Sequence, residues 1–444
     1  MITIKLYDSL KSITNDLDNK KINIYSCGPT VYNYIHIGNA RPSLLVDTLV
    51  RYLKSRSVDV NYLQNITDID DKIINRAIEE GLTEKEISTK YMNAYLDDLD
   101  AMNVLRPTQL TPISDKLDLM LTYIEDMVKS GDAYVVDGDV YFDIKKWESK
   151  YGQLSGRKID ELISGERVEV ELKKHNPLDF TLWKKTDVGI KWDSVFGPGR
   201  PGWHTECVLL IDDYFNGETI DIHAGGIDLK FPHHENERIQ FWAHNNKELA
   251  LNWMHNGHLT LEDEKMSKSL GNTILAKDFI AEHGPNLLRW IFLTTYYRQP
   301  LNINESLIGQ GKKFFDKISN INKKVIAHLV MNDYVITNKL DDSIIEEFNT
   351  HMDNDLNTSR VLTLLEQIVK DLNKSLTEKE SIKIDQYISS MKYILDTLGF
   401  IDLINIDFTE EDREIFKQWK ELLNQKDFAK ADELRAILIE KKLV

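Results

Sequence analysis

Residues 21–53 hold the feature that most constrains the fold of this chain. Residues 21–26 (KINIYS) alternate between polar and apolar side chains, which predicts a strand. A turn follows, and apolar residues then recur at helical spacing from Leu44 to Leu53, with Pro42 suited to the first helical turn. A strand, a loop and a helix in this order begin a nucleotide-binding α/β unit. A second predicted strand at 58–66 makes a parallel sheet the expectation.

Length and composition fit a globular protein of several domains. The chain has 444 residues, 42% of them hydrophobic and 29% charged, and at roughly 150 residues per domain this suggests about three domains. The composition excludes collagen and a chain that is disordered from end to end. Only two cysteines are present, Cys27 and Cys207, so a disulfide scaffold is excluded.

Charge and hydropathy limit the partners. No apolar run approaches the roughly 20 residues of a membrane helix, and the first residues lack the features of a signal peptide. We therefore expect a soluble cytoplasmic protein without a membrane partner. The net charge of −17 excludes a general polyanion binder, so nucleic acid would bind only on a locally basic surface.

The pattern of elements changes twice along the chain. Residues 132–143 predict two short strands around Asp137-Gly138, which is a strong hairpin signal. This hairpin interrupts the α/β alternation, so we interpret about 115–185 as an insertion. Beyond about 305, helical spacing dominates to the end. The expected domains are a catalytic domain at 1–304, a helical bundle at 305–400 and a small unit at 401–444.

The tetrapeptide His36-Ile-Gly-Asn39 lies at the mouth of the first predicted helix. A helix N-terminus presents free N–H groups and a partial positive charge, which favours phosphate. Gly38 lets a ligand approach the backbone, and His36 can donate a hydrogen bond to a phosphate oxygen. The alternative interpretation is a polar helix cap with an incidental histidine.

The pentapeptide Lys265-Met-Ser-Lys-Ser269 lies far downstream. Two lysines three residues apart in a loop with serine and glycine can both reach one polyphosphate. They would neutralise charge on a leaving pyrophosphate, because positioning and electrostatics carry most of such chemistry. The alternative is a solvated basic loop.

Four residues form a possible metal set. Cys27 precedes the His36 segment, Cys207 ends the segment PGWHTEC, and FPHHENE places His233 and Glu237 four residues apart on one helix face. Two thiolates, an imidazole and a carboxylate suit tetrahedral zinc. The alternatives are two buried cysteines and a polar pair on a helix surface. A separation of 180 residues and the lack of a CxxC motif keep these alternatives open.

The two phosphate-binding candidates together resemble class I aminoacyl-tRNA synthetases. HIGN matches their HIGH motif with Asn39 in the last place, and KMSKS matches their mobile loop without change. CGPTVYNYIHIGNAR, NITDIDDKI, PGWHTEC, FPHHENE and KMSKSLGN together resemble the cysteinyl-tRNA synthetase family essentially from end to end. The resemblance implies a doubly wound, Rossmann-like catalytic domain with an inserted connective region, then a helical bundle and a small anticodon-binding unit.

The resemblance also implies specific roles for residues. One zinc ion per subunit would be bound by Cys27, Cys207, His233 and Glu237. The catalytic residues would be His36, Lys265 and Lys268. ATP would contact His36, Gly38, Asn39, Gly225, Gly226, Asp228, Lys265, Met266, Ser267, Lys268 and Ser269. The substrate cysteine would contact Cys27, Thr67, Trp203 and His223.

Some of these roles compete with simpler interpretations. Trp203 could be a core residue, and the segment from Gly225 to Asp228 could be a glycine-rich turn with a solvated aspartate. We interpret the cluster at 68–71 as a turn that starts a helix rather than as a magnesium site. Trp419 could stack on an unpaired tRNA base, or it could belong to a helix core. The family usually continues with a short tail, so we expect part of the anticodon-reading surface to be missing.

The resemblance implies a two-step reaction. ATP, with Mg²⁺, activates L-cysteine to cysteinyl-adenylate, and the terminal ribose of tRNA(Cys) then takes the cysteinyl group, with zinc selecting the substrate thiol. A related cysteine ligase with an amino-sugar acceptor is one alternative, which the helical residues after 305 argue against. A non-catalytic nucleotide- or RNA-binding homologue is another, against which His36 and both lysines are present. We expect a monomer that needs no protein partner.

Overall fold

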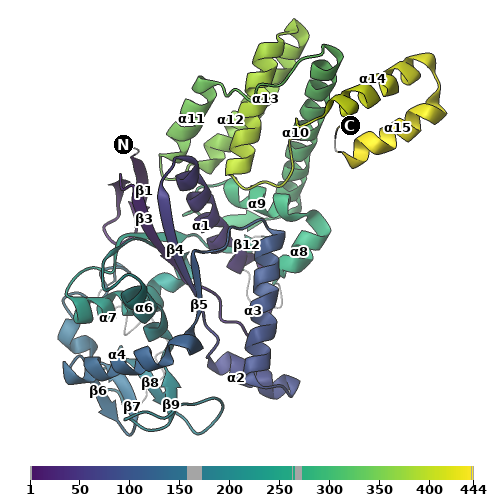
Figure 1. Cartoon of the computed structure of the whole chain (residues 1–444). Coiled ribbons are helices and arrows are strands. Elements are labelled where there is room, and N and C mark those ends of the chain that lie inside the picture. The colour runs from purple at the N-terminus through teal and green to yellow at the C-terminus, as the bar shows by residue number, and fades with distance from the viewer. Residues whose placement is uncertain (1–2, 158–172, 263, 266–272, 442, 444) are drawn as a thin grey trace. The chain divides into compact units, whose positions relative to one another are not determined.

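The computed structural model of the chain describes residues 3–157, 173–262, 264–265, 273–441 and 443 (Figure 1). The chain divides into two compact units. Unit 1 comprises Met1–Pro285 with Tyr297–Asn302, and unit 2 comprises Asn286–Tyr296 with Ile303–Val444. Within the described part of the chain, no helix has both the length and the apolar character that a membrane crossing needs.

Unit 1 is built on a five-stranded parallel sheet. Its strands are β3 (Lys21–Ser26), β4 (Asp59–Ile66), β5 (Gln109–Pro112), β10 (Ile220–Gly226) and β11 (Ala250–Asn256). The strand order is β11-β10-β3-β4-β5, and each neighbouring pair is parallel. The chain moves outward from β3 to β5 and then returns to place β10 on the other side of β3. The doubly wound parallel sheet is therefore confirmed, with its switch point between β3 and β10, where such folds bind ligands.

Helices pack on this sheet, and most residues of its central strands are buried. Every residue of β10 is buried, as expected for a strand with both faces covered. The helix α1 packs on β4, β10 and β11 and buries Leu44, Leu49 and Leu53, while α6 packs on β4. The helices of unit 1 are α1 (Ile37–Ser55), α2 (Asp71–Glu80), α3 (Glu84–Ala101), α4 (Leu117–Lys129), α6 (Trp203–Tyr214), α7 (Glu235–Asn245) and α8 (Ala276–His283).

Smaller sheets complete unit 1. The strands β1 (Ile4–Asp8) and β2 (Ile13–Leu17) form an antiparallel pair, and β12 (Leu259–Leu261) and β13 (Glu264–Lys265) form another. A four-stranded antiparallel sheet contains β6 (Ala133–Val136), β7 (Asp139–Phe142), β8 (Phe180–Lys185) and β9 (Gly199–Pro201). The hairpin at Asp137-Gly138 is confirmed, because both residues have positive φ angles, 53° and 91°, as a tight hairpin turn requires.

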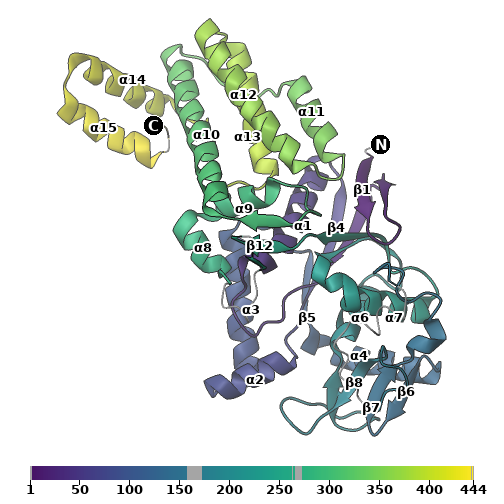
Figure 2. The same cartoon turned by 180° about the vertical axis from the view of Figure 1, so that it is seen from behind.

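Unit 2 is helical, apart from the end of β14 (Leu301–Ile303), which spans the division. Its helices are α9 (Pro285–Leu293), α10 (Glu305–Met331), α11 (Asp342–Met352), α12 (Thr358–Glu378), α13 (Ser381–Thr397), α14 (Glu410–Gln425) and α15 (Phe428–Glu440). The helices α10 to α13 pack side by side in both views (Figures 1 and 2). The helices α14 and α15 pair with each other, and their Phe416 and Leu438 bury against Ile326 and Val330 of α10.

Asp98 on α3 provides a test of stability against pH. Its side chain faces α8, is 6% exposed, and its Oδ2 is buried without a hydrogen-bond partner among the described residues. Burial raises the pKa of Asp98 to about 6, partly opposed by Lys277 and assisted by Asp97 and Asp278. Between about pH 4 and 6 the unfolded chain therefore loses a proton that the folded chain keeps, so stability falls as pH rises through this window.

Asp98→Asn is expected to remove this pH-dependent loss. The difference in melting temperature between variant and native protein should shift in favour of the variant from pH 4 to 7, by an amount equivalent to about 1–3 kcal/mol. Thermal denaturation at several pH values measures it. Asp97→Asn, at an exposed neighbouring position, is the control and should show a much smaller change. A constant difference across this pH range would refute the explanation.

Candidate active site

Four possible metal ligands converge at the switch point of the sheet. Cys27 directly follows β3, Cys207 lies in α6, and His233 and Glu237 lie just before and within α7. Cys27 is half-buried and the other three are buried. Their ligand atoms all lie within 4.8 Å of one another. The fold therefore joins residues that the sequence separates by up to 210 positions.

The distances between these ligand atoms suit a tetrahedrally coordinated ion. The two Sγ atoms are 3.9 Å apart, Cys207 Sγ is 3.5 Å from His233 Nε2, and Cys27 Sγ is 3.7 Å from Glu237 Oε1. Zinc bonds of about 2.0–2.3 Å imply tetrahedral edges of about 3.3–3.8 Å. His233 Nε2 and Glu237 Oε1 are closer, at 2.8 Å. The donor set therefore fits zinc after a small separation of that pair.

Further histidines surround the four ligands. His204 Nδ1 lies 2.9 Å from His233 Nδ1, and His223 Nε2 lies 2.6 Å from Glu237 Oε2. Residues that are hydrogen-bonded to metal ligands in this way orient those ligands. His223, which the resemblance assigns to the substrate cysteine, is thus a buried partner of Glu237 in this structure.

Sequence reasoning did not identify His204, His234 or His255. His234 Nε2 lies 3.3 Å from Cys27 Sγ, and His234 Nδ1 lies 2.9 Å from His255 Nε2. With His223 and Glu237, Cys27 and His234 form a second group of possible metal ligands. The sequence did offer a signal for two of them, because His204 follows Trp203 and His234 follows His233, and both of those neighbours were predicted site residues. The first group holds both thiols, which are the soft ligands that zinc favours.

The charges of the clustered residues are set by one another as well as by burial. Burial favours the neutral form of Glu237, but His233 and His223 outweigh burial and hold its pKa well below the ordinary value. Burial also opposes charge on His233, but Glu237 and Cys207 raise its pKa to about 10. Burial and His233 lower the pKa of His204 to about 3. Glu237 is therefore anionic at neutral pH and His233 carries a proton, which a metal ion would have to displace.

His36 is the N-cap of α1. Its Nδ1 accepts a hydrogen bond from the backbone N–H of Asn39 at 3.2 Å, and Asn39 Oδ1 accepts from the backbone N–H of His36 at 3.3 Å. The polar-cap interpretation is confirmed, and it is compatible with catalysis, because a neutral ring that accepts at Nδ1 carries its proton on Nε2. This capping box starts α1 before the position that Pro42 suggested, so Pro42 lies inside the helix.

The chain that follows the KMSKS segment is hydrogen-bonded beside His36. Met266, Ser267, Lys268 and Ser269 lie outside the described residues, and Lys265 is described only as the end of β13, paired with Thr260. Downstream, the carbonyl of Ile274 accepts from the N–H of Ile37 at 3.0 Å. The N–H of Ala276 donates to the carbonyl of Ile35 at 2.9 Å. The chain thus returns from the KMSKS segment to the turn that holds His36.

Comparisons with known proteins agree with this geometry. The family model of the tRNA synthetases class I (C) catalytic domain matches residues 13–313, and that of the DALR domain matches 347–402. A relative named cysteine–tRNA ligase from Mycoplasma mycoides subsp. mycoides SC is 59% identical over 98% of this chain and 99% of its own. The chain belongs to the cysteine–tRNA ligase family.

More distant comparisons extend this assignment. A cysteine–tRNA ligase from Oceanobacillus iheyensis is 41% identical over 100% of this chain and 97% of its own. A solved structure of Mycobacterium tuberculosis methionyl-tRNA synthetase with methionyl-adenylate is 14% identical, with a TM-score of 0.65 over 86% of this chain and 90% of its own. This second similarity shows that the class I fold is shared.

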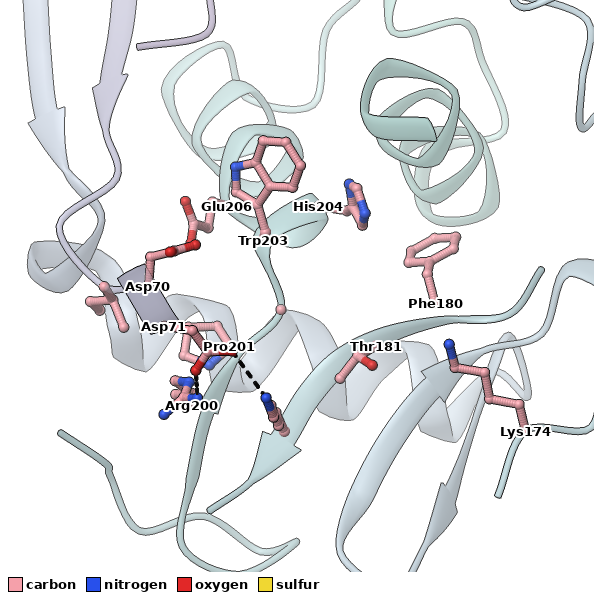
Figure 3. A pocket seen from close by; sticks show the side chains of 13 residues that line it. Asp70, Asp71, Lys174, Phe180, Thr181, Arg200, Pro201, Trp203, His204 and Glu206 are labelled. Carbon is pink, nitrogen blue, oxygen red and sulfur yellow. Dashed lines mark hydrogen bonds and ion pairs between the residues drawn. The ribbon is translucent and has the colours of Figure 1, made fainter. Parts of the chain in front are cut away.

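An open cavity of about 290 Å³ lies beside Trp203 (Figure 3). Trp203 is 41% exposed and its ring stacks on His233 at a centroid distance of 4.1 Å, so the core interpretation of Trp203 is wrong. Asp71 pairs with Arg200 and Lys184 on the cavity wall. The lining residues are Ile69, Asp70, Asp71, Lys174, Phe180, Thr181, Lys184, Arg200, Pro201, Gly202, Trp203, His204 and Glu206.

The remaining predicted residues of unit 1 lie at ends of the sheet strands. Gly225 and Gly226 end β10, and a Cβ on Gly225 would lie 2.7 Å from the His234 ring, so only glycine fits there. Asp228 is exposed. Asp70 caps α2 by accepting from the N–H of Lys72 at 2.7 Å, which confirms the helix-starting turn.

Trp419 in unit 2 combines packing with a neighbouring cation. Its ring meets Phe416 edge-on at 5.3 Å and joins the small apolar cluster around Ile326 and Leu438. Lys420 Nζ lies 4.4 Å from the ring centroid. The core contact predicted as one alternative is therefore present, and a role in binding tRNA stays a prediction.

Proposed function

We propose that this chain joins L-cysteine to tRNA(Cys) and that a zinc ion selects the substrate. Cysteine reacts with ATP to give cysteinyl-adenylate and pyrophosphate, and the terminal ribose of the tRNA then takes the cysteinyl group. One observation carries the zinc part: two thiols, an imidazole and a carboxylate lie within 4.8 Å of one another at the switch point. The identity of 59% to a cysteine–tRNA ligase over the full chain supports the reaction.

Cys27, Cys207, His233 and Glu237 would hold the zinc ion. Cysteine and serine differ only in SH against OH, and an apolar pocket separates such near-isosteres weakly. When bound, zinc supplies a soft Lewis acid that prefers a thiolate to a hydroxyl. Trp203 is exposed beside His233 and would line the substrate pocket where it opens to solvent. The resemblance assigns Thr67 to the polar groups of the substrate, although its side chain is 1% exposed and donates to Glu206. His223 would contribute to the pocket while orienting Glu237.

ATP would bind along the carboxyl ends of β3 and β10. The N-terminus of α1 favours phosphate, and His36 would donate from Nε2 to the α-phosphate as charge develops there. Gly38 and Asn39 lie in the same first turn. Gly225 and Gly226 would face the adenosine, and Asp228 would accept from ribose hydroxyls. Lys265, Met266, Ser267, Lys268 and Ser269 would close on the pyrophosphate, and Mg²⁺ would accompany ATP.

Lys268→Ala is expected to slow adenylate formation by about 10- to 100-fold, which is the value of one charge-assisted hydrogen bond. The affinity for cysteine should change little, since the lysine would act on the leaving pyrophosphate. Single-turnover measurement of adenylate formation with cysteine titration separates the two effects. Lys277→Ala, on the neighbouring helix α8, is the control. A variant that changed only cysteine affinity would contradict the assigned role.

The domains of the chain would divide the work. Residues 1–304 would carry catalysis, with the insert at about 115–185 as the connective region. The bundle at 305–400 and the unit at 401–444, including Trp419, would bind tRNA(Cys), and the DALR match at 347–402 supports a tRNA-binding role for this region. A translation enzyme of this kind would act in the cytoplasm.

ATP–pyrophosphate exchange across all twenty amino acids tests the proposed function. Exchange with cysteine alone would support the site and its thiol selectivity. Exchange with another amino acid, or with none in zinc-loaded protein, would refute it. Charging of tRNA(Cys), compared with an amino-sugar acceptor, then decides the second step.

A further inference from the structure

One buried side chain connects the two segments that carry the cysteines. Asn65, next to last in β4, is 1% exposed. Its Oδ1 accepts hydrogen bonds from the backbone N–H of Gly28 at 2.6 Å and from the hydroxyl of Tyr25 at 2.9 Å. Its Nδ2 donates to Thr67 Oγ1 at 3.1 Å. Asn65 thus fixes the residue that follows Cys27.

The connection continues from Thr67 to the residue before Cys207. The hydroxyl of Thr67 donates to Oε2 of Glu206 at 2.7 Å, and both residues are 1% exposed. Gly28, Asn65, Thr67 and Glu206 therefore form a buried relay of hydrogen bonds. We call these four residues the Asn65 relay. Its two ends are the immediate neighbours of Cys27 and Cys207.

The direction of the Asn65 relay follows from its chemistry. Thr67 has one hydroxyl proton, which it donates to Oε2 of Glu206, so its hydroxyl oxygen accepts from Asn65. The amide nitrogen of Asn65 must then point at Thr67, and its oxygen at Gly28 and Tyr25. Asparagine supplies this donor and this acceptor on one short side chain, whereas aspartate supplies acceptors only.

We propose that Asn65 is a positioning residue for the metal centre, which sets the separation of Cys27 and Cys207 through the Asn65 relay. This inference rests on the proposed zinc site. Zinc would bind both sulfurs as thiolates, which repel each other, so the scaffold must hold the two Sγ atoms close together, at 3.9 Å in this structure. Metal sites tolerate deviations of only about 0.2 Å in ligand distances, and loss of an outer partner typically weakens metal binding about 10- to 100-fold.

Asn65→Asp is expected to weaken zinc binding about 10- to 100-fold. The variant keeps the acceptor for Gly28 but removes the amide donor to Thr67, so the single hydroxyl proton of Thr67 faces acceptors at both 65 and 206. The measurement is the zinc dissociation constant by competition with a chromogenic chelator, without substrates. Asn61→Asp, at the other end of β4, where Asn61 accepts from Tyr214, is the matched control and should bind zinc as the native protein does.

The double variant N65D/E206Q tests the relay itself. Glutamine at 206 can donate to Thr67, and Thr67 can then donate to aspartate at 65, so both hydrogen bonds of the Thr67 hydroxyl are restored in the reverse direction. Zinc affinity should recover to within about threefold of the native value. A role of Asn65 in packing alone predicts no recovery. Native-like zinc binding by N65D, or no recovery in N65D/E206Q, would overturn the proposal.

A second variant keeps the test decisive if N65D does not fold. Thr67→Val removes the central hydroxyl at nearly constant volume and should also weaken zinc binding about 10- to 100-fold. An unchanged zinc dissociation constant in this variant would overturn the proposal. If the native protein itself binds no zinc, the zinc part of the proposed function fails. If the native protein binds zinc and the variants bind it equally well, only the inference about Asn65 fails.

Discussion

Cys207→Ser is expected to weaken zinc binding by more than about 100-fold, because loss of a ligand should exceed the 10- to 100-fold cost of losing an outer partner. Serine has nearly the same shape, but its hydroxyl stays protonated at neutral pH and is a poor ligand for zinc. Cys207 Sγ contacts His233 Nε2 at 3.5 Å and lies 3.9 Å from Cys27 Sγ. Its loss would therefore leave the zinc ion with three protein ligands.

Discrimination between cysteine and serine should fall with the metal. Without zinc, the pocket separates two near-isosteres by shape alone, and such pockets give modest selectivity. The ratio of exchange rates with cysteine and serine measures this, alongside zinc affinity by chelator competition. Val208→Thr is the matched control, since it adds a hydroxyl at the next buried position of α6 without touching a ligand. Native zinc affinity and selectivity in C207S would refute the zinc assignment.

His36→Asn is expected to lower kcat for adenylate formation by about 10²- to 10³-fold, the usual cost of removing one preorganised donor. Asparagine is among the best N-cap residues, so it can replace the Nδ1 contact with Asn39 and keep α1 intact. It is too short to place a donor where Nε2 lies. The melting temperature, zinc affinity and cysteine affinity should therefore stay close to native values.

His36→Ala separates the two roles of this residue. It should lose the same catalytic factor and, in addition, about 1 kcal/mol of stability from the missing cap. Pyrophosphate exchange kinetics and thermal denaturation of both variants provide the comparison. If H36N kept most of the native rate, His36 would be a cap and nothing more.

Local patterns were sufficient for most elements of the fold. The strand at 21–26 and the hairpin at Asp137-Gly138 were predictable because alternation and turn chemistry depend on neighbours in sequence. The start of α1 was placed less well. Pro42 suits a first turn, but the reciprocal bonds between His36 and Asn39 begin the helix earlier. That capping box was present in the sequence as two polar residues three apart.

The chemical character of the candidate site was predicted from the sequence through the family resemblance. The residue types of HIGN, KMSKS and the four candidate ligands carry their chemistry wherever the fold places them. The burial of Trp203 could not be read in this way, because an aromatic residue at the start of a helix suits a core and a pocket equally. Trp203 is 41% exposed and lines a cavity with Phe180 and Thr181 of β8, which come from another part of the chain.

The sequence by itself determined which elements form and which residues can act as metal ligands, phosphate partners and helix caps, because these properties belong to short segments and to side-chain chemistry. Only the tertiary structure decided how those residues are used. His233 and His234 are adjacent in the chain, yet His233 contacts Cys207 and Glu237 while His234 contacts Cys27 and His255. The same holds for Asn65, whose hydrogen bonds cross 37 residues to Gly28 and continue through Thr67 across 139 residues to Glu206. Such contacts depend on the order of strands in the sheet, which no local pattern encodes.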